Sequence, residues 1–184
     1  MLLKIFFLVW FFLPSGIANM VPVFAARIPW LDRWNYPADG YISAGSKRLL
    51  GDHKTIRGFV CGILAGLVVT VIQFAIIRQW PHLAATFPPD YVSANPLLLG
   101  LLLGAGALLG DSAKSFFKRR AGVAPGKSWF PFDQLDYVLG SIVFTVLYVP
   151  LSLGHYLGLL VIGVLLHMAA VYIGYHLKIR DSAM

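Results

Sequence analysis

The hydrophobic residues of this chain gather in long uncharged runs, and most charged residues lie in the segments between them. A helix that crosses the roughly 30 Å hydrocarbon layer of a membrane needs about 20 mainly apolar residues. Runs of about that length or longer are Ile5 to Ala26, Phe59 to Ile77, Tyr91 to Gly110 and Tyr137 to Leu177. The pattern predicts an all-α integral membrane protein.

The last run is too long for one crossing. Its 41 residues would extend about 60 Å as a single helix, roughly twice the hydrocarbon thickness. Pro150 and Gly154 lie within it and are suited to ending one helix and starting the next. We expect a single domain over residues 1–184 with five transmembrane helices, at about residues 5–26, 59–77, 91–117, 134–150 and 154–177.

The first run also permits a second interpretation. Lys4, the apolar residues after it and the sequence Pro14-Ser15-Gly16 are typical of a secretory signal peptide. The uncharged stretch continues to Ala26, however, and this is longer than the apolar core of most such peptides. We interpret the run as a span, and a count of four spans would leave every polar cluster on the same face.

The composition is typical of a membrane protein, and the distribution of charged residues predicts how the protein is oriented in the membrane. The chain is 58% hydrophobic and 12% charged, with fifteen Lys and Arg against eight acids, all of them aspartate. Thirteen of the basic residues fall in segments 27–57, 114–127 and 178–180, and short basic loops stay on the cytoplasmic side of a membrane. We expect a multi-pass cell-membrane protein with its N-terminus outside, its C-terminus in the cytoplasm and its site facing the cytoplasm.

Two classes of function are disfavoured. The basic residues are clustered between apolar runs instead of spread over a polar surface, which argues against nucleic-acid binding. Cys61 is the one cysteine, so a disulfide framework and a cysteine-based metal cluster are excluded. The bilayer is the partner that the composition indicates, and nothing in the sequence identifies a protein partner.

Asp111 closes the third apolar run, where a carboxylate is costly to desolvate and therefore indicates function. If the helix continues past this point, Lys114, Ser115 and Lys118 share its face at offsets of three, four and seven. The alternative is that Lys114 merely neutralises Asp111. The cations at residues 118–120 would then extend their side chains to the lipid headgroups. We favour function for Asp111 and the headgroup role for Arg120.

Asp133 and Asp136 begin the next predicted span, three residues apart, so both carboxylates can face one ion. Mg²⁺ binds one or two carboxylates together with substrate phosphates. The alternative is helix capping, with Asp133 at the N-cap. Beside Asp111 on the same side of the membrane, the pair predicts a site for a metal ion and a phosphate.

The loop before the second span, residues 47–58, has the composition of a phosphate cradle. Glycine, hydroxyl and basic residues directly precede a helix N-terminus there, where backbone N–H groups and charged side chains can meet a phosphate. The candidate residues are Gly51, Asp52, Lys54, Thr55 and Arg57. The alternative is an ordinary basic loop on the cytoplasmic side.

These motifs together resemble a known family. Gly110-Asp111 with Ser115 and Lys118-Arg119, then Pro125-Gly126 and Phe132-Asp133 with Asp136, is similar to the C-terminal signature of the CDP-diglyceride synthase (phosphatidate cytidylyltransferase) superfamily. The loop at residues 48–58 resembles that of its archaeal branch, the CDP-archaeol synthases. The resemblance covers residues 48–141. The bacterial pattern has Glu where Lys114 stands and a downstream Lys-Asp pair that this sequence lacks.

The resemblance implies a CTP-dependent cytidylyltransferase in a transmembrane catalytic domain, with two cytoplasmic polar loops forming its active site. It implies Mg²⁺-dependent transfer of CMP from CTP to 2,3-bis-O-geranylgeranylglycerol 1-phosphate, giving CDP-archaeol and pyrophosphate for archaeal membrane lipids. The implied catalytic residues are Asp111, Lys114, Asp133 and Asp136, of which the three aspartates would bind the metal. The implied contacts to CTP or phosphate are Gly51, Asp52, Lys54, Thr55, Arg57, Ser115, Lys118 and Arg119.

Two other functions compete with this one. A CDP-alcohol phosphotransferase would carry an Asp-Gly-x2-Ala-Arg signature, which the sequence lacks. A small transporter or ion-coupled channel that uses Asp111 as a relay would need polar residues along several spans. Apart from scattered histidines, Gln73 and Asn95, the predicted spans are nearly all apolar. The transporter is kept as the alternative.

Overall fold

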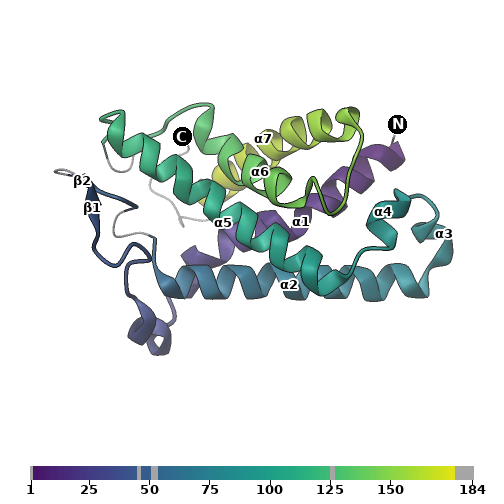
Figure 1. Ribbon diagram of the computed structural model, residues 1–184, viewed down its shortest axis with the longest axis horizontal. Coiled ribbons are helices and arrows are strands. Elements are labelled where there is room, and N and C mark those ends of the chain that lie inside the picture. The colour runs from purple at the N-terminus through teal and green to yellow at the C-terminus, as the bar shows by residue number, and fades with distance from the viewer. Residues whose placement is uncertain (1, 45–46, 51–53, 125–126, 177–184) are drawn as a thin grey trace.

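Helices make up most of the computed structural model, which describes residues 2–44, 47–50, 54–124 and 127–176 (Figure 1). The long helices are α1 (Leu2–Ala25), α2 (Ile56–Gln79), α5 (Pro96–Arg120), α6 (Phe132–Thr145) and α7 (Leu153–His176). The short elements are the 3₁₀ helix η1 (Pro29–Trp34), the antiparallel strands β1 (Ser43–Ala44) and β2 (Lys47–Arg48), and the single-turn helices α3 (Pro81–Ala84) and α4 (Pro89–Val92).

Among the described residues, α1, α2, α5 and α7 are long and apolar enough to cross a membrane. The chain is therefore an all-α membrane protein with four candidate spans. Their bounds follow the predicted runs, except that α5 begins at Pro96 and not at Tyr91. Asn95 sets this start, because its side chain accepts hydrogen bonds from the N–H groups of Leu97 and Leu98, at 2.9 and 3.2 Å.

The predicted span at residues 134–150 differs from the structure. Helix α6 has 14 residues and ends at Thr145, so it is about 21 Å long and shorter than the hydrocarbon layer. The chain then turns, with the N–H of Val149 bonded to the carbonyl of Thr145 at 2.8 Å. Pro150 follows, and a proline disfavours helix at the residue before it. The structure thus has four candidate spans and one shorter helix.

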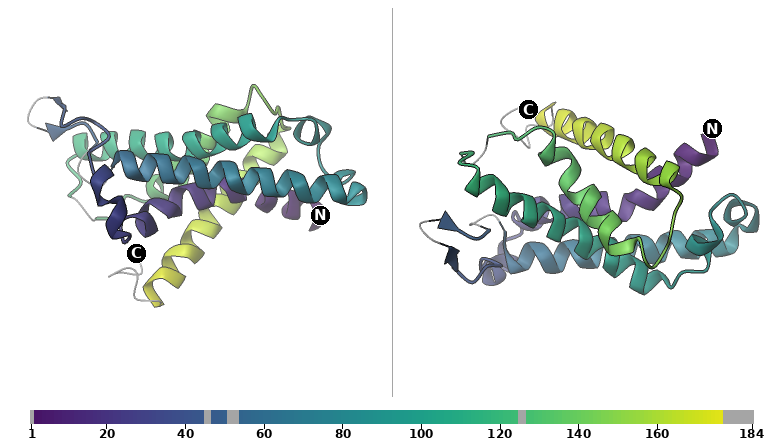
Figure 2. Two further views of the ribbon diagram at one scale, coloured as in Figure 1. Left: turned by 90° about the horizontal axis from the view of Figure 1, so that it is seen from below. Right: turned by 45° about the horizontal axis from the view of Figure 1, so that its top comes forward.

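Helix α5 lies among α1, α2 and α6 and packs against all three (Figures 1 and 2). Glycines make these contacts close, as is common between membrane helices. A methyl group added to Gly104 would lie 3.1 Å from the Cα of Ile63 on α2. One added to Gly110 would collide with the carbonyl oxygen of Asp136 on α6. The spacing of α5 and α6 therefore depends on the absence of side chains at their contact.

The two ends of the bundle differ in chemistry. Helices α3 and α4 lie at one end and the β hairpin at the other (Figure 1). Near α4 the core is aromatic: Phe7 and Phe74 pack on the ring of Tyr91, whose hydroxyl accepts a 2.9 Å hydrogen bond from Nε1 of Trp10. The charged residues of α5 lie at its other end, so apolar packing and polar chemistry are separated along the bundle.

Candidate functional site

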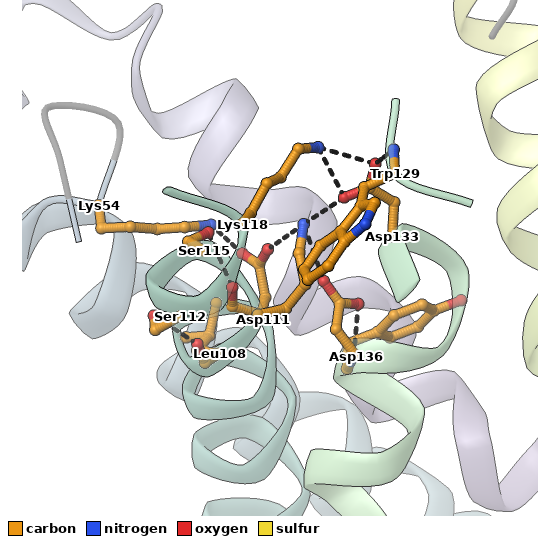
Figure 3. A network of polar contacts seen from close by, with 11 residues as sticks. Lys54, Leu108, Asp111, Ser112, Ser115, Lys118, Trp129, Asp133 and Asp136 are labelled. Atoms are coloured by element: carbon orange, nitrogen blue, oxygen red, sulfur yellow. Dashed lines mark hydrogen bonds and ion pairs between the residues drawn. The ribbon is translucent and has the colours of Figure 1, made fainter. Parts of the chain in front are cut away.

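The close contact of α5 and α6 brings two acidic helix segments together (Figure 3). Asp111 directly follows Gly110, the residue whose missing side chain leaves room for the Asp136 carbonyl. Asp133 lies in the first turn of α6, one turn before Asp136. The packing thus places the carboxylates of both helices around the side chain of Lys114, one turn after Asp111 on α5.

Lys114 is the centre of this arrangement. Its ammonium nitrogen lies 2.8 Å from Oδ1 of Asp133, 3.0 Å from Oδ2 of Asp136 and 3.3 Å from Oδ1 of Asp111. One cation therefore contacts three carboxylates from two helices. Carboxylate oxygens are also the type of ligand that hard metal cations take.

Two further lysines flank the cluster (Figure 3). Lys54, from the segment before α2, forms an ion pair with Oδ2 of Asp111. Lys118, one turn beyond Lys114, donates to both oxygens of Asp133, at 3.0 and 2.9 Å. The backbone N–H of Trp129 donates to Oδ2 of the same carboxylate. Three ammonium groups and three carboxylates thus form one cluster, in which each carboxylate is paired with at least one ammonium group.

Burial makes this pairing necessary. The side chain of Asp136 is only 4% exposed, and those of Asp111 and Lys114 are 17% and 16% exposed. A buried carboxylate without a partner loses its hydration with no compensation, which costs several kcal/mol. At Asp133, burial acts to raise the pKa of the carboxyl, but hydrogen bonds from Lys114, Lys118 and the Trp129 N–H outweigh it and lower that pKa below its ordinary value.

Two hydroxyl groups from the predicted set are bonded to helix backbone. Ser115 Oγ donates to the carbonyl of Asp111 at 2.9 Å. Thr55 is the N-cap of α2, where its Oγ1 accepts from the N–H of Gly58 at 3.1 Å. The Thr55 hydroxyl therefore caps the helix that directly follows Lys54, and the Ser115 hydroxyl is bonded within the helix that carries Asp111.

The structure brings together some of the predicted residues and separates others. Arg57 points to η1, and its guanidinium donates to Asp32 in η1 and to Asn35 directly after it, away from Asp111, Asp133 and Asp136. Arg119 lies in the last turn of α5, next to Lys118. Gly51 and Asp52 fall outside the described residues. Lys54 thus connects the first loop to the carboxylates.

Several polar contacts of this region were not predicted. They include the Trp129 N–H to Asp133, the pairing of Arg57 with Asp32, and the ion pair of Arg48 with the buried Asp39. Asp32 and Arg57 are 25 residues apart, so no helical or strand spacing relates them. The signal in the sequence was an aspartate close to Arg27 and Arg33 in a segment with more basic than acidic residues.

The chain has clear relatives among known proteins. It matches, over residues 1–184, the family described as CarS-like, CDP-archaeol synthase. It is similar to the CDP-archaeol synthase of Thermococcus kodakarensis, with 34% identity over 95% of this chain and 93% of the relative. It is 40% identical to that of Methanospirillum hungatei over 73% of this chain and 80% of the relative.

A solved structure is also similar. It is described as an intramembrane enzyme for archaeal membrane lipids biosynthesis, and it has 30% sequence identity and a TM-score of 0.69, covering 88% of this chain and 90% of that one. The family match, the relatives and the fold agree with one another and confirm the resemblance found in the sequence motifs. The chain therefore belongs to the CDP-archaeol synthase family, the CTP-dependent cytidylyltransferases of archaeal membrane lipid biosynthesis.

Proposed function

We propose that the cluster of Asp111, Asp133 and Asp136 with Lys54, Lys114 and Lys118 is the active site of this enzyme. The observation that carries the proposal is the convergence of three carboxylates from α5 and α6 on one ammonium group at the polar end of the bundle. Family membership makes the chain an enzyme, so the transporter alternative is set aside.

The proposed reaction joins CTP to 2,3-bis-O-geranylgeranylglycerol 1-phosphate. An oxygen of the lipid phosphate attacks the α-phosphorus of CTP and forms a new P–O bond. The bond from the α-phosphorus to the bridging oxygen breaks, and pyrophosphate leaves with that oxygen. The lipid phosphate is anionic at neutral pH, so it needs no dedicated base. Catalysis then consists of positioning the two phosphates and neutralising their charge.

The lysines supply this neutralisation in the proposal. Lys54, Lys114 and Lys118 come from two separate parts of the chain and converge on one site. Ammonium groups bind phosphate oxygens as point charges. We assign the triphosphate and the lipid phosphate to these three side chains and to Arg119, which lies beside Lys118 on α5. Gly51, Asp52, Thr55 and Ser115 are assigned to shaping the loop and the helix that carry the charged groups.

The carboxylates fit Mg²⁺ by their chemistry, because hard divalent cations take oxygen ligands. Among the described residues, no group of three acidic, His or Cys side chains is arranged to hold a metal ion, since the ammonium of Lys114 lies between the carboxylates. We propose Asp111, Asp133 and Asp136 as the Mg²⁺ ligands. When bound, the ion would neutralise charge on the triphosphate.

We further propose how the protein lies in the membrane. Residues 134–150, which include most of α6, form a fifth and shorter membrane segment beside α5, within one catalytic domain of residues 1–184. The N-terminus is outside, and the C-terminus and the carboxylate cluster face the cytoplasm. The clustering of basic residues in segments 27–57 and 114–127 supports this orientation.

The proposal is tested with the purified protein in detergent, Mg²⁺, the lipid phosphate and each of the four nucleoside triphosphates in turn. We expect CTP alone to give a CDP-lipid and an equal amount of pyrophosphate. Asp111→Asn should lower this turnover by roughly 100-fold or more, because it removes a negatively charged ligand of the proposed Mg²⁺, which would neutralise charge on the triphosphate.

Asp90→Asn is the matched control, since Asp90 is an exposed aspartate of α4, at the other end of the bundle. It should keep full turnover. Circular dichroism would show that both variants retain their helices. Wild-type turnover in a folded Asp111→Asn protein would contradict the proposed site.

A further inference from the structure

We infer that Arg57 is a positioning residue: together with Asp32 and Asn35 it holds the backbone of Lys54 so that the Lys54 ammonium reaches Asp111. The inference rests on the proposed function, in which Lys54 binds phosphate. It assigns Arg57 a different part from the direct phosphate contact that the sequence motif predicts.

The guanidinium of Arg57 ties two elements together. Arg57 lies in the first turn of α2 and is 5% exposed. Its Nη1 donates to Oδ1 of Asp32 at 2.6 Å, and its Nη2 donates to Oδ1 of Asn35 at 3.1 Å. Asp32 belongs to η1 and Asn35 directly follows it. The guanidinium is buried while the Asp32 side chain is 65% exposed, so the carboxylate keeps much of its hydration and is partly screened. The bonds to Asp32 and Asn35 together join η1 to the start of α2.

The segment after η1 in turn holds the backbone around Lys54. The N–H of Ala38 donates to the carbonyl of Lys54 at 2.7 Å, and the N–H of Ile56 donates to the carbonyl of Tyr36 at 2.8 Å. Pro37 and Thr55 form the antiparallel bridge between these two bonds. Lys54 is therefore bonded to a segment that begins one residue after the anchored Asn35.

The side chain of Lys54 extends from this point to a different helix. It forms its ion pair with Asp111, 57 residues later in the sequence. A lysine side chain is long and flexible, so where its ammonium lies depends on how firmly its backbone is held. Groups that bind reacting phosphates act best when their positions are set in advance by the surrounding structure. Asp32, Asn35 and Arg57 supply that constraint here.

Arg57 itself is poorly placed for a phosphate. Both of its terminal nitrogens already donate to acceptors in or next to η1. Its side chain is buried, whereas Lys54 directs its ammonium to the carboxylate cluster. The two basic residues of one short motif thus have different roles. Arg57 joins two elements of the structure, and Lys54 contacts the carboxylate cluster.

The first test does not depend on turnover. Hydrogen exchange of the Ala38 and Ile56 amides, followed by mass spectrometry in detergent without nucleotide, reports whether the backbone bridge is closed. We expect Asp32→Ala and Arg57→Lys to speed the exchange of both amides about tenfold or more, which corresponds to about 1.4 kcal/mol of lost protection. Arg33→Ala, which changes an exposed neighbour on η1, should leave it unchanged. Unaltered exchange in Asp32→Ala and Arg57→Lys would overturn the inference.

The second test asks whether the effect passes through Lys54. We expect Asp32→Ala to raise the KM for CTP about tenfold and to change kcat little, because Lys54 holds phosphate in both the ground state and the transition state. In a Lys54→Ala background, Asp32→Ala should have no further effect on KM. A loss of kcat alone, or an equal KM effect without Lys54, would overturn the inference. If the wild-type protein did not turn over CTP at all, the proposed function would fail while the exchange test still decided the anchoring role.

Discussion

At the scale of single residues, the ammonium of Lys114 is the cation that the three carboxylates of the site share. It contacts Asp111, Asp133 and Asp136 at once, and among the described residues it is the cation paired with Asp136. Mg²⁺ takes the same carboxylate oxygens as ligands. We therefore expect the ammonium of Lys114 and the metal ion to compete for them.

This competition predicts the behaviour of Lys114→Met. Breaking a buried ion pair by removing one partner destabilises a protein by about 3–5 kcal/mol, so the variant should melt at a lower temperature in metal-free buffer. Added Mg²⁺ should raise its Tm more than that of the wild-type protein, because the ion replaces the missing cation. Thermal melting in detergent with and without Mg²⁺ measures both effects.

Arg120→Met is the control for this prediction. Arg120 is an exposed cation on the same helix, with its guanidinium 3.4 Å from the ring centre of Phe116. Its removal should leave the Mg²⁺-dependent change in Tm as in the wild-type protein. If Lys114→Met responded to Mg²⁺ no more strongly than Arg120→Met, the competition would be refuted.

At the scale of elements, the contact between α5 and α6 sets the distance between the two acidic segments. Gly106 and Gly110 of α5 face Gly140 of α6 so closely that a methyl group on Gly140 would collide with the carbonyl oxygen of Gly106. Such contacts leave the backbones no room to shift. The ion pair of Lys114 with Asp136 depends on this spacing, because the two residues lie on the two helices.

We expect Gly140→Ala to separate the helices and weaken the site. Overpacking of this kind costs about 1–3 kcal/mol, so Tm and CDP-lipid formation should both fall. Gly16→Ala is the matched change, since a methyl group on Gly16 would have no atom within 4 Å. It should be neutral or slightly stabilising, because alanine favours helix over glycine. If Gly140→Ala had the same Tm and the same rate of CDP-lipid formation as Gly16→Ala, this interpretation of the contact would be contradicted.

At the scale of the whole molecule, the proposed orientation follows from the charges. Positively charged loops remain in the cytoplasm. The described residues of the basic segments 27–57 and 114–127 lie at the end of the bundle that carries the β hairpin and the end of α5 (Figure 1). The connection between α2 and α5, which contains α3 and α4, lies at the opposite end. The two ends should therefore face different sides of the membrane.

Cysteine labelling tests this orientation. In a Cys61→Ser background, Arg33→Cys and Asp90→Cys place single thiols at exposed positions of opposite ends. With an impermeant maleimide on intact cells, we expect Asp90→Cys to react and Arg33→Cys to react only after the membrane is opened. The opposite pattern would show that the carboxylate cluster faces outward.

Much of the helical layout was predictable because it is a local property. An apolar run must match the membrane thickness, so the starts and ends of α1, α2 and α7 follow the runs closely. The start of α5 was missed by five residues because its Asn95 cap lies inside an uncharged stretch. The end of α6 was missed for a similar reason, since apolar residues continue past Thr145 while the helix does not.

The sequence by itself determined the membrane class, the charged segments and the shared helix face of Asp111 and Lys114, because hydrophobicity and helical periodicity act over a few residues. Only the tertiary structure decided that Lys54 reaches Asp111, that Arg57 turns to η1 instead, and that one lysine contacts three carboxylates. These contacts join residues far apart in the chain. Their distances depend on how closely the helices pack, and a linear pattern does not contain that spacing.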